Sequence, residues 1–160
     1  MHSTVFELSE RPVPAGRWIT PGYLPDWFFA GADYAERMSC AEREGSIAAL
    51  VDCLGGDCIR QGDCLTFAPV LREHYFRERY RCFRAAAQML ANAEYEVFAG
   101  ITPAPAFLLA LHGLRESYED RRGFYIYQAA QNALLPLDRW LRTADLSLPY
   151  YVGGTIHYHY

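Results

Sequence analysis

The sequence contains no lysine, and all 15 of its basic residues are arginine. No lysine can therefore serve as a Schiff-base former or a general base. No uninterrupted apolar run approaches the roughly 18–20 residues that a membrane span needs, so we expect no contact with a membrane. The first residues, Met1 to Thr4, are not basic and no long apolar stretch follows them. We therefore expect no secretory signal and a cytoplasmic protein.

Sequence motifs of the common catalytic and cofactor-binding sites are also missing. Walker, dinucleotide-binding and G-x-S-x-G motifs are absent, and no helix is expected after Gly153-Gly154 to complete a phosphate cradle. The five cysteines are odd in number and match no C-x2-C zinc spacing, which favours reduced thiols in the core over a metal or redox site. We expect no cofactor. The sequence favours a binding protein over an enzyme, although catalytic residues that meet only in space would leave no motif.

Charge argues against two further classes of protein. The net charge is -4, whereas a general nucleic-acid binder normally carries a basic excess. The 19 acidic residues are scattered along the chain, whereas a mimic of DNA would need them in dense runs.

The pattern of apolar residues predicts one α+β domain over residues 1–160, because 51% hydrophobic content in a chain of this length can form a core. Strands are expected at 4–9, 64–67 and 123–127, with a last strand at 150–160 broken by Gly153-Gly154. Helices are expected at 39–54, 69–92, 103–120 and 137–143. The first begins at a capping box, Ser39 to Glu42, and ends at Gly55. Strands and helices do not alternate regularly, so we expect a small, mostly antiparallel sheet packed against two or three helices.

The two central helices have apolar stripes. On the first, Phe76, Phe83 and Leu90 share one side and are expected to be largely buried. The stripe also holds Ala87 and is flanked by Tyr75, Tyr80 and Ala86. The second helix has its apolar residues at Phe107, Leu108, Leu111, Leu114 and Tyr118.

An arginine face, made of Arg77, Arg81 and Arg84, lies opposite the first stripe. With Arg72 and Arg79, five guanidinium groups fall within thirteen residues and could bind carboxylates or phosphates in a bidentate manner. Alternatively, these arginines form a solvated surface with ion pairs such as Glu73-Arg77 and Glu78-Arg81. Arg79 lies on the apolar side, so it needs an acidic mate or a partner. The predicted partner-binding residues are Arg77, Arg79, Arg81, Arg84, Tyr75 and Tyr80.

Two histidines near the end of the sequence form a second candidate site. His157 and His159 are two residues apart in an expected strand, so both side chains lie on one face and could bind one metal ion. A metal site needs a third ligand, and His2, a carboxylate or a thiol could supply it. The alternating Tyr and His residues are also typical of a half-exposed strand.

Three segments carry a resemblance to known proteins: FELSERPVPAGRWIT (6–20), RRGFYIY (121–127) and YYVGGTIHYHY (150–160). They resemble a group of small uncharacterised proteins carried on conjugative and phage elements of gut bacteria, often beside antirestriction genes. The resemblance implies a bacterial cytoplasmic protein of a mobile element and raises an anti-defence role, either antirestriction or anti-CRISPR. It implies no catalytic residue.

These observations predict a non-catalytic protein that binds a macromolecule, most simply another protein. Arginine and tyrosine are the residue types that dominate the energetics of interfaces. One alternative is a small metal-dependent enzyme that uses His157 and His159. Another is a nucleic-acid-binding accessory protein that uses the arginine-rich helix. The sequence leaves the oligomeric state open.

Overall fold

The computed structural model describes residues 2–29, 34–118 and 123–159, except for the side chains of residues 2, 27 and 29. The α+β class and the mostly antiparallel sheet are confirmed. The chain divides into two compact units. We call residues 1–72 with 122–160 the sheet unit, and residues 73–121 the hairpin unit.

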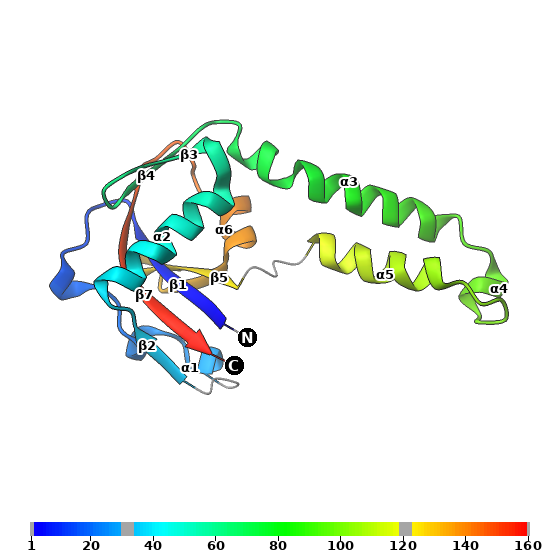
Figure 1. Ribbon diagram of the computed structural model, residues 1–160, viewed down its shortest axis with the longest axis horizontal. Helices are drawn as coiled ribbons and strands as arrows, with labels where there is room; N and C mark the ends of the chain where they lie inside the picture. Colours follow the sequence, from blue (N-terminus) through cyan, green and yellow to red (C-terminus); the bar gives the residue numbers. More distant parts are fainter. Residues whose placement is uncertain (1, 30–33, 119–122, 160) are drawn as a thin grey trace. The chain divides into compact units, whose positions relative to one another are not determined.

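The sheet has seven strands in the order β3-β4-β7-β1-β5-β6, with β2 also pairing with β7 (Figure 1). Their bounds are β1 His2–Ser9, β2 Tyr34–Arg37, β3 Cys58–Gln61, β4 Cys64–Phe67, β5 Phe124–Gln128, β6 Ala133–Pro136 and β7 Tyr150–His159. β4 pairs with the beginning of β7 and β2 with its end, so both use the edge that β1 leaves free. β7 is thus the strand that holds the sheet together.

Strands β1 and β5 form the one parallel pair among the described strands. Thr4 lies opposite Phe124 and Glu7 opposite Tyr127. The carboxyl ends of parallel strands meet at the same edge of a sheet. The residues after Ser9 and after Gln128 therefore lie close together.

The predicted break of the last strand at Gly153-Gly154 is wrong. β7 continues through both glycines, and only its register with β1 shifts, between Phe6 and Leu8. A Cβ atom on Gly153 would overlap the Glu7 carboxylate, and one on Gly154 would lie 2.9 Å from the backbone nitrogen of Ile19. The glycines are needed for this close approach and do not end the strand.

Both faces of the sheet are covered. Successive strand residues point to opposite faces. On one face Val5, Ile156 and Tyr158 pack with Leu24 and Phe28 of the segment that includes α1 (Asp26–Phe29). Helix α2 (Cys40–Leu54) and helix α6 (Leu137–Thr143) contribute the buried side chains Ile47, Leu50, Leu137, Trp140 and Leu141.

Helix α2 begins as predicted. The Ser39 backbone nitrogen donates to Glu42 Oε2 at 2.8 Å, and the Glu42 nitrogen donates to Ser39 Oγ at 3.3 Å. The hydrogen bond from the Ser39 side chain lowers the pKa of Glu42. The helix ends at Gly55, whose φ of 74° lies in the left-handed region that favours glycine.

The hairpin unit consists of α3 (Leu71–Ala91, whose first residues belong to the sheet unit), α4 (Tyr95–Phe98) and α5 (Pro105–Tyr118) (Figure 1). Phe76, Phe83 and Leu90, which we expected to be largely buried, are half-buried. Among the described residues of this unit, only Ala86 and Ala110 are buried. Two helices alone cannot enclose large side chains.

Candidate functional site

The arginine face lies on the surface of α3, and each of its arginines has a partner on the same helix. Arg77 pairs with Glu73, and Arg81 pairs with Glu78 at 3.1 Å. Arg84 donates to the Tyr80 hydroxyl at 3.3 Å. Exposed pairs of this kind contribute only about 0.2–0.5 kcal/mol each, so a carboxylate of a partner can displace them.

Arg79 and Tyr75, two of the predicted partner-binding residues, contact other residues of the hairpin unit. Arg79 is half-buried, donates from Nε to the carbonyl of Ser117 at 3.1 Å, and lies 5.8 Å from the centre of the Phe76 ring. Tyr75 packs edge-on against the same ring, with centroids 5.0 Å apart. Both side chains therefore make contacts inside the hairpin unit. Arg72, at the start of the helix, donates to the carbonyls of Leu141 and Ala144 and so satisfies the end of α6.

Exposed apolar side chains are concentrated in the hairpin unit, which sequence reasoning missed. Among the described residues, 14 large apolar or tyrosine side chains are exposed, and nine of them belong to this unit. The unit holds less than a third of the chain, so exposed side chains of this kind are more than three times as frequent in it as in the sheet unit. The nine are Tyr80, Met89, Tyr95, Phe98, Ile101, Leu108, Leu109, Leu111 and Tyr118.

Three of these residues form a row along α5. Leu108, Leu111 and Tyr118 are three and seven residues apart, so they share one side of the helix. They are 66%, 45% and 61% exposed. We call them the leucine row. The sequence held a signal for it, since α5 carries Phe107, Leu108, Leu109, Leu111 and Leu114, more apolar residues than a single buried side can hold.

The two histidines lie on the same face of β7 and are half-buried. His157 Nδ1 is 3.4 Å from the Tyr34 hydroxyl, and the Tyr34 ring lies beside both imidazoles. The strand register puts His2 opposite His159, but the His2 side chain is outside the described part of the chain. Among the described residues, no group of three or more His, Cys, Asp or Glu side chains could hold a metal ion. The metal site stays a prediction.

Two buried charged residues meet at Gly153-Gly154, and sequence reasoning missed both. Glu7 is 3% exposed, and its Oε2 accepts hydrogen bonds from the backbone nitrogens of Ile19 at 3.0 Å and Gly154 at 2.8 Å. Arg43 is 4% exposed and donates to the carbonyls of Val152 at 2.6 Å and Gly153 at 2.8 Å. Glu7 thus satisfies two backbone amides and Arg43 two backbone carbonyls in the interior of the sheet unit.

Arg43 also connects to the surface. Its Nη2 lies 2.8 Å from Asp63, its Nη1 lies 3.3 Å from Glu44, and the guanidinium lies 4.4 Å from the centre of the Trp18 ring. Arg37 contacts the same indole at 5.1 Å. This arrangement fixes the segment that carries Trp18 and Ile19 on the sheet, which is a structural role.

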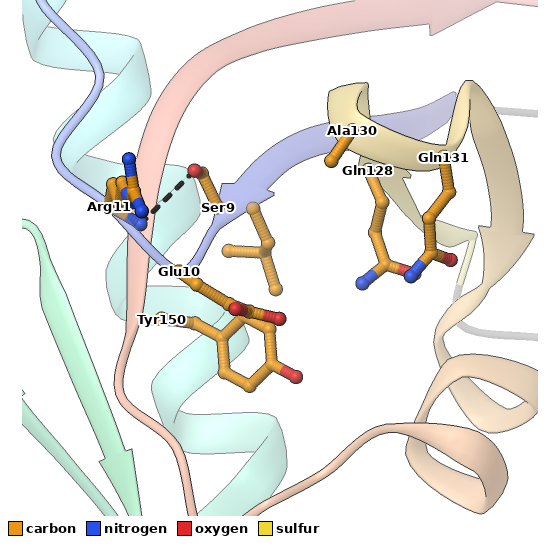
Figure 2. A pocket seen from close by; sticks show the side chains of 8 residues that line it. Ser9, Glu10, Arg11, Gln128, Ala130, Gln131 and Tyr150 are labelled. Carbon is orange, nitrogen blue, oxygen red and sulfur yellow. Dashed lines mark hydrogen bonds between the residues drawn. The ribbon is translucent and has the colours of Figure 1, made fainter.

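A polar cavity of about 310 Å³ lies at the carboxyl ends of β1 and β5 (Figure 2). The amides of Gln128 and Gln131 lie on one side, and the Glu10 carboxylate lies beside the Tyr150 hydroxyl on the other. Burial raises the pKa of Tyr150, and the charges of Glu10 and Asp145 raise it further. The phenol therefore stays protonated at neutral pH and can donate a hydrogen bond to a polar ligand, but it is a poor base.

A second cavity, of about 560 Å³, is lined by Glu7, Arg17, Tyr23, Tyr127 and Asn132, among others. We call it the Glu7 cavity. The Tyr127 hydroxyl donates to Asn132 Oδ1 at 3.3 Å. Burial raises the pKa of Tyr127, and Glu7 and then Tyr23 raise it further.

No protein-family model, curated protein or solved structure matches this chain. In the part of the chain that the structure describes, no helix is both long enough and apolar enough to cross a bilayer.

Proposed function

We propose that the protein is a non-catalytic binding protein whose hairpin unit docks onto another protein. The observation that carries this proposal is the concentration of exposed apolar side chains on the hairpin unit, where only two of the described residues are buried. Exposed apolar patches on a soluble protein mark interaction sites, and a partner would supply the apolar contacts that two helices cannot supply to each other.

The residues indicate the chemistry of the partner. The leucine row has the spacing with which an amphipathic helix enters an apolar groove. Helix α3 carries five arginines and two glutamates, so it has an excess of three positive charges although the whole chain is acidic. The proposed partner therefore has an apolar groove with carboxylates near it. The resemblance to mobile-element proteins suggests the finer proposal that this partner belongs to a bacterial defence system.

The test compares a double substitution on α5, which keeps the helix intact, with a single control substitution elsewhere. Leu108→Gln with Leu111→Gln replaces two members of the leucine row by good helix formers. The control, Ile59→Gln, changes a side chain of similar exposure on β3, outside the hairpin unit. Each variant is used as bait in a lysate of the native host, and the captured proteins are quantified by mass spectrometry. We expect one protein to be retained by the parent and the control and lost with the double variant.

The arginine face is tested in the same assay. Replacing all three of its arginines by glutamine should leave folding intact and weaken binding by about 2 kcal/mol or more for each desolvated pair that is lost. Binding of the parent should also weaken as salt increases. If every captured protein binds the leucine-row variant and the control equally well, the proposal is wrong. Retention of nucleic acid that depends on the arginine face but not on the leucine row would favour the nucleic-acid-binding alternative.

A further inference from the structure

The Glu7 cavity combines a buried carboxylate with an arginine, and this combination points to a ligand. Glu7 lines the cavity floor on β1, and Arg17 lines the same cavity from the segment that precedes β2. The cavity volume of about 560 Å³ lies within the range of roughly 300–1,000 Å³ that small-molecule sites occupy.

The hydrogen bonds that Glu7 accepts from the backbone do not require a charged side chain. Both backbone amides donate to the same oxygen, Oε2. No described residue donates a hydrogen bond to Oε1 or forms an ion pair with Glu7. The single oxygen of a glutamine side chain could accept the same two bonds. Buried carboxylates are normally paired with a cation, so the structure leaves a position beside Glu7 where a cationic group would be stabilised.

Two tyrosines make this position suitable for an organic cation. Tyr23 and Tyr127 line the cavity. Glu7 and Tyr23 are both close enough to Tyr127 to raise the pKa of its hydroxyl, in addition to the effect of burial. The direction of that shift keeps the Tyr127 hydroxyl protonated and uncharged. Aromatic rings beside a carboxylate are a common environment for ammonium groups.

Arg17 lines the same cavity and favours a ligand that also carries a negative charge. It is exposed, and its guanidinium makes no hydrogen bond or ion pair with a described residue. An arginine that lines the cavity would repel a simple cation but would bind a carboxylate in a bidentate manner. We propose that the Glu7 cavity binds a small zwitterion of the amino-acid class, with its ammonium group at Glu7 and its carboxylate at Arg17. This inference is independent of docking by the hairpin unit.

The experiment uses probes that share a carbon skeleton and differ in charge. Phenylalanine carries both charged groups, phenethylamine only the ammonium, and 3-phenylpropionate only the carboxylate. A matched aliphatic set consists of leucine, 3-methylbutylamine and 4-methylpentanoate. Binding to the whole chain is measured by calorimetry at neutral pH. In at least one set we expect the amino acid to bind about tenfold or more tightly than either single-charge analogue, since each charged contact is worth about 1.4 kcal/mol or more.

Two variants assign the contacts. Glu7→Gln should remove the advantage of the amino acid over its carboxylate-only analogue, and Arg17→Gln should remove its advantage over the amine. Arg11→Gln, which changes an arginine at the other cavity, should leave the affinities unchanged. The proposal is overturned if neither amino acid binds at up to about 10 mM, or if the Arg17→Gln variant, whose change is on the surface, binds all probes like the parent. Because Arg17 is exposed, this arm remains decisive even if Glu7→Gln fails to fold.

Discussion

Replacement of Arg43 by leucine should strongly destabilise the sheet unit. The substitution keeps much of the apolar volume of the side chain but removes every donor. The carbonyls of Val152 and Gly153 lose hydrogen bonds of 2.6 and 2.8 Å at a place that solvent hardly reaches. They lie beside the register shift between β7 and β1, and Val152 and Gly153 are buried, so water cannot readily replace the lost donors.

The magnitude follows from these contacts. Leaving a buried acceptor unsatisfied costs about 1–3 kcal/mol, so the two carbonyls together account for about 2–6 kcal/mol. The contact with the Trp18 ring at 4.4 Å adds about 0.5–2 kcal/mol. The ion pairs with Asp63 and Glu44 add little, because both carboxylates are about half exposed and screened by solvent. We expect a loss of about 2.5–8 kcal/mol in the free energy of unfolding.

Urea denaturation followed by tryptophan fluorescence is the appropriate assay, because all three tryptophans belong to the sheet unit. Arg60→Leu is the matched control. Arg60 also binds a carbonyl and Glu44, but it does so at the surface, so its loss should cost no more than about 1 kcal/mol. The reasoning is refuted if the two variants unfold at the same urea concentration with the same slope.

Three further predictions concern α2, the thiols and β7. The lowered pKa of Glu42 means that its ionised form stabilises the folded state above the ordinary value of 4.5, and that this contribution is lost as the pH falls through the lower folded value. The urea midpoint should therefore depend less on pH in this acidic range after Ser39→Ala, and an unchanged dependence would contradict the assignment. Alkylation of the native protein should modify the exposed Cys40 early and Cys58 last, because burial raises the pKa of Cys58 to about 11. Peptide mapping by mass spectrometry measures the order of modification, and the reverse order would contradict this prediction. Gly153→Ala should destabilise the protein by about 1–3 kcal/mol, because its methyl group would displace the carboxylate that lies against that glycine; a midpoint equal to that of the parent would show that this carboxylate can move freely.

Local patterns in the sequence predicted the elements that have strong local signals. The capping box at Ser39 and the glycine at position 55 define both ends of α2, and the predicted bounds of α6 agree with the structure. Strands β2, β3 and β6 were not predicted. Each has four residues, too few for a clear alternation, and each is stabilised by its pairing with a neighbour.

The buried charges could not be predicted because their partners are distant in sequence. Glu7 occurs in a strand with an ordinary alternation, and the amide it binds belongs to Gly154. Arg43 lies four residues after a helix N-cap, where an exposed side chain is the usual expectation. The periodicity of α3 and α5 correctly predicts two helices with apolar stripes, but it does not reveal which of their apolar side chains are exposed.

The position of β7 in the chain has a consequence for synthesis on the ribosome. Its residues Tyr150–His159 are translated after every other strand, yet they pair with β1, β2 and β4. The contacts of the hairpin unit are closer in sequence, and helices form within about a microsecond, whereas translation adds only about 5–20 residues per second. The hairpin unit can therefore form while β1 and β4 still have unpaired edges. During that interval the nascent chain already presents the leucine row, whereas its sheet is incomplete and open to pairing with other chains.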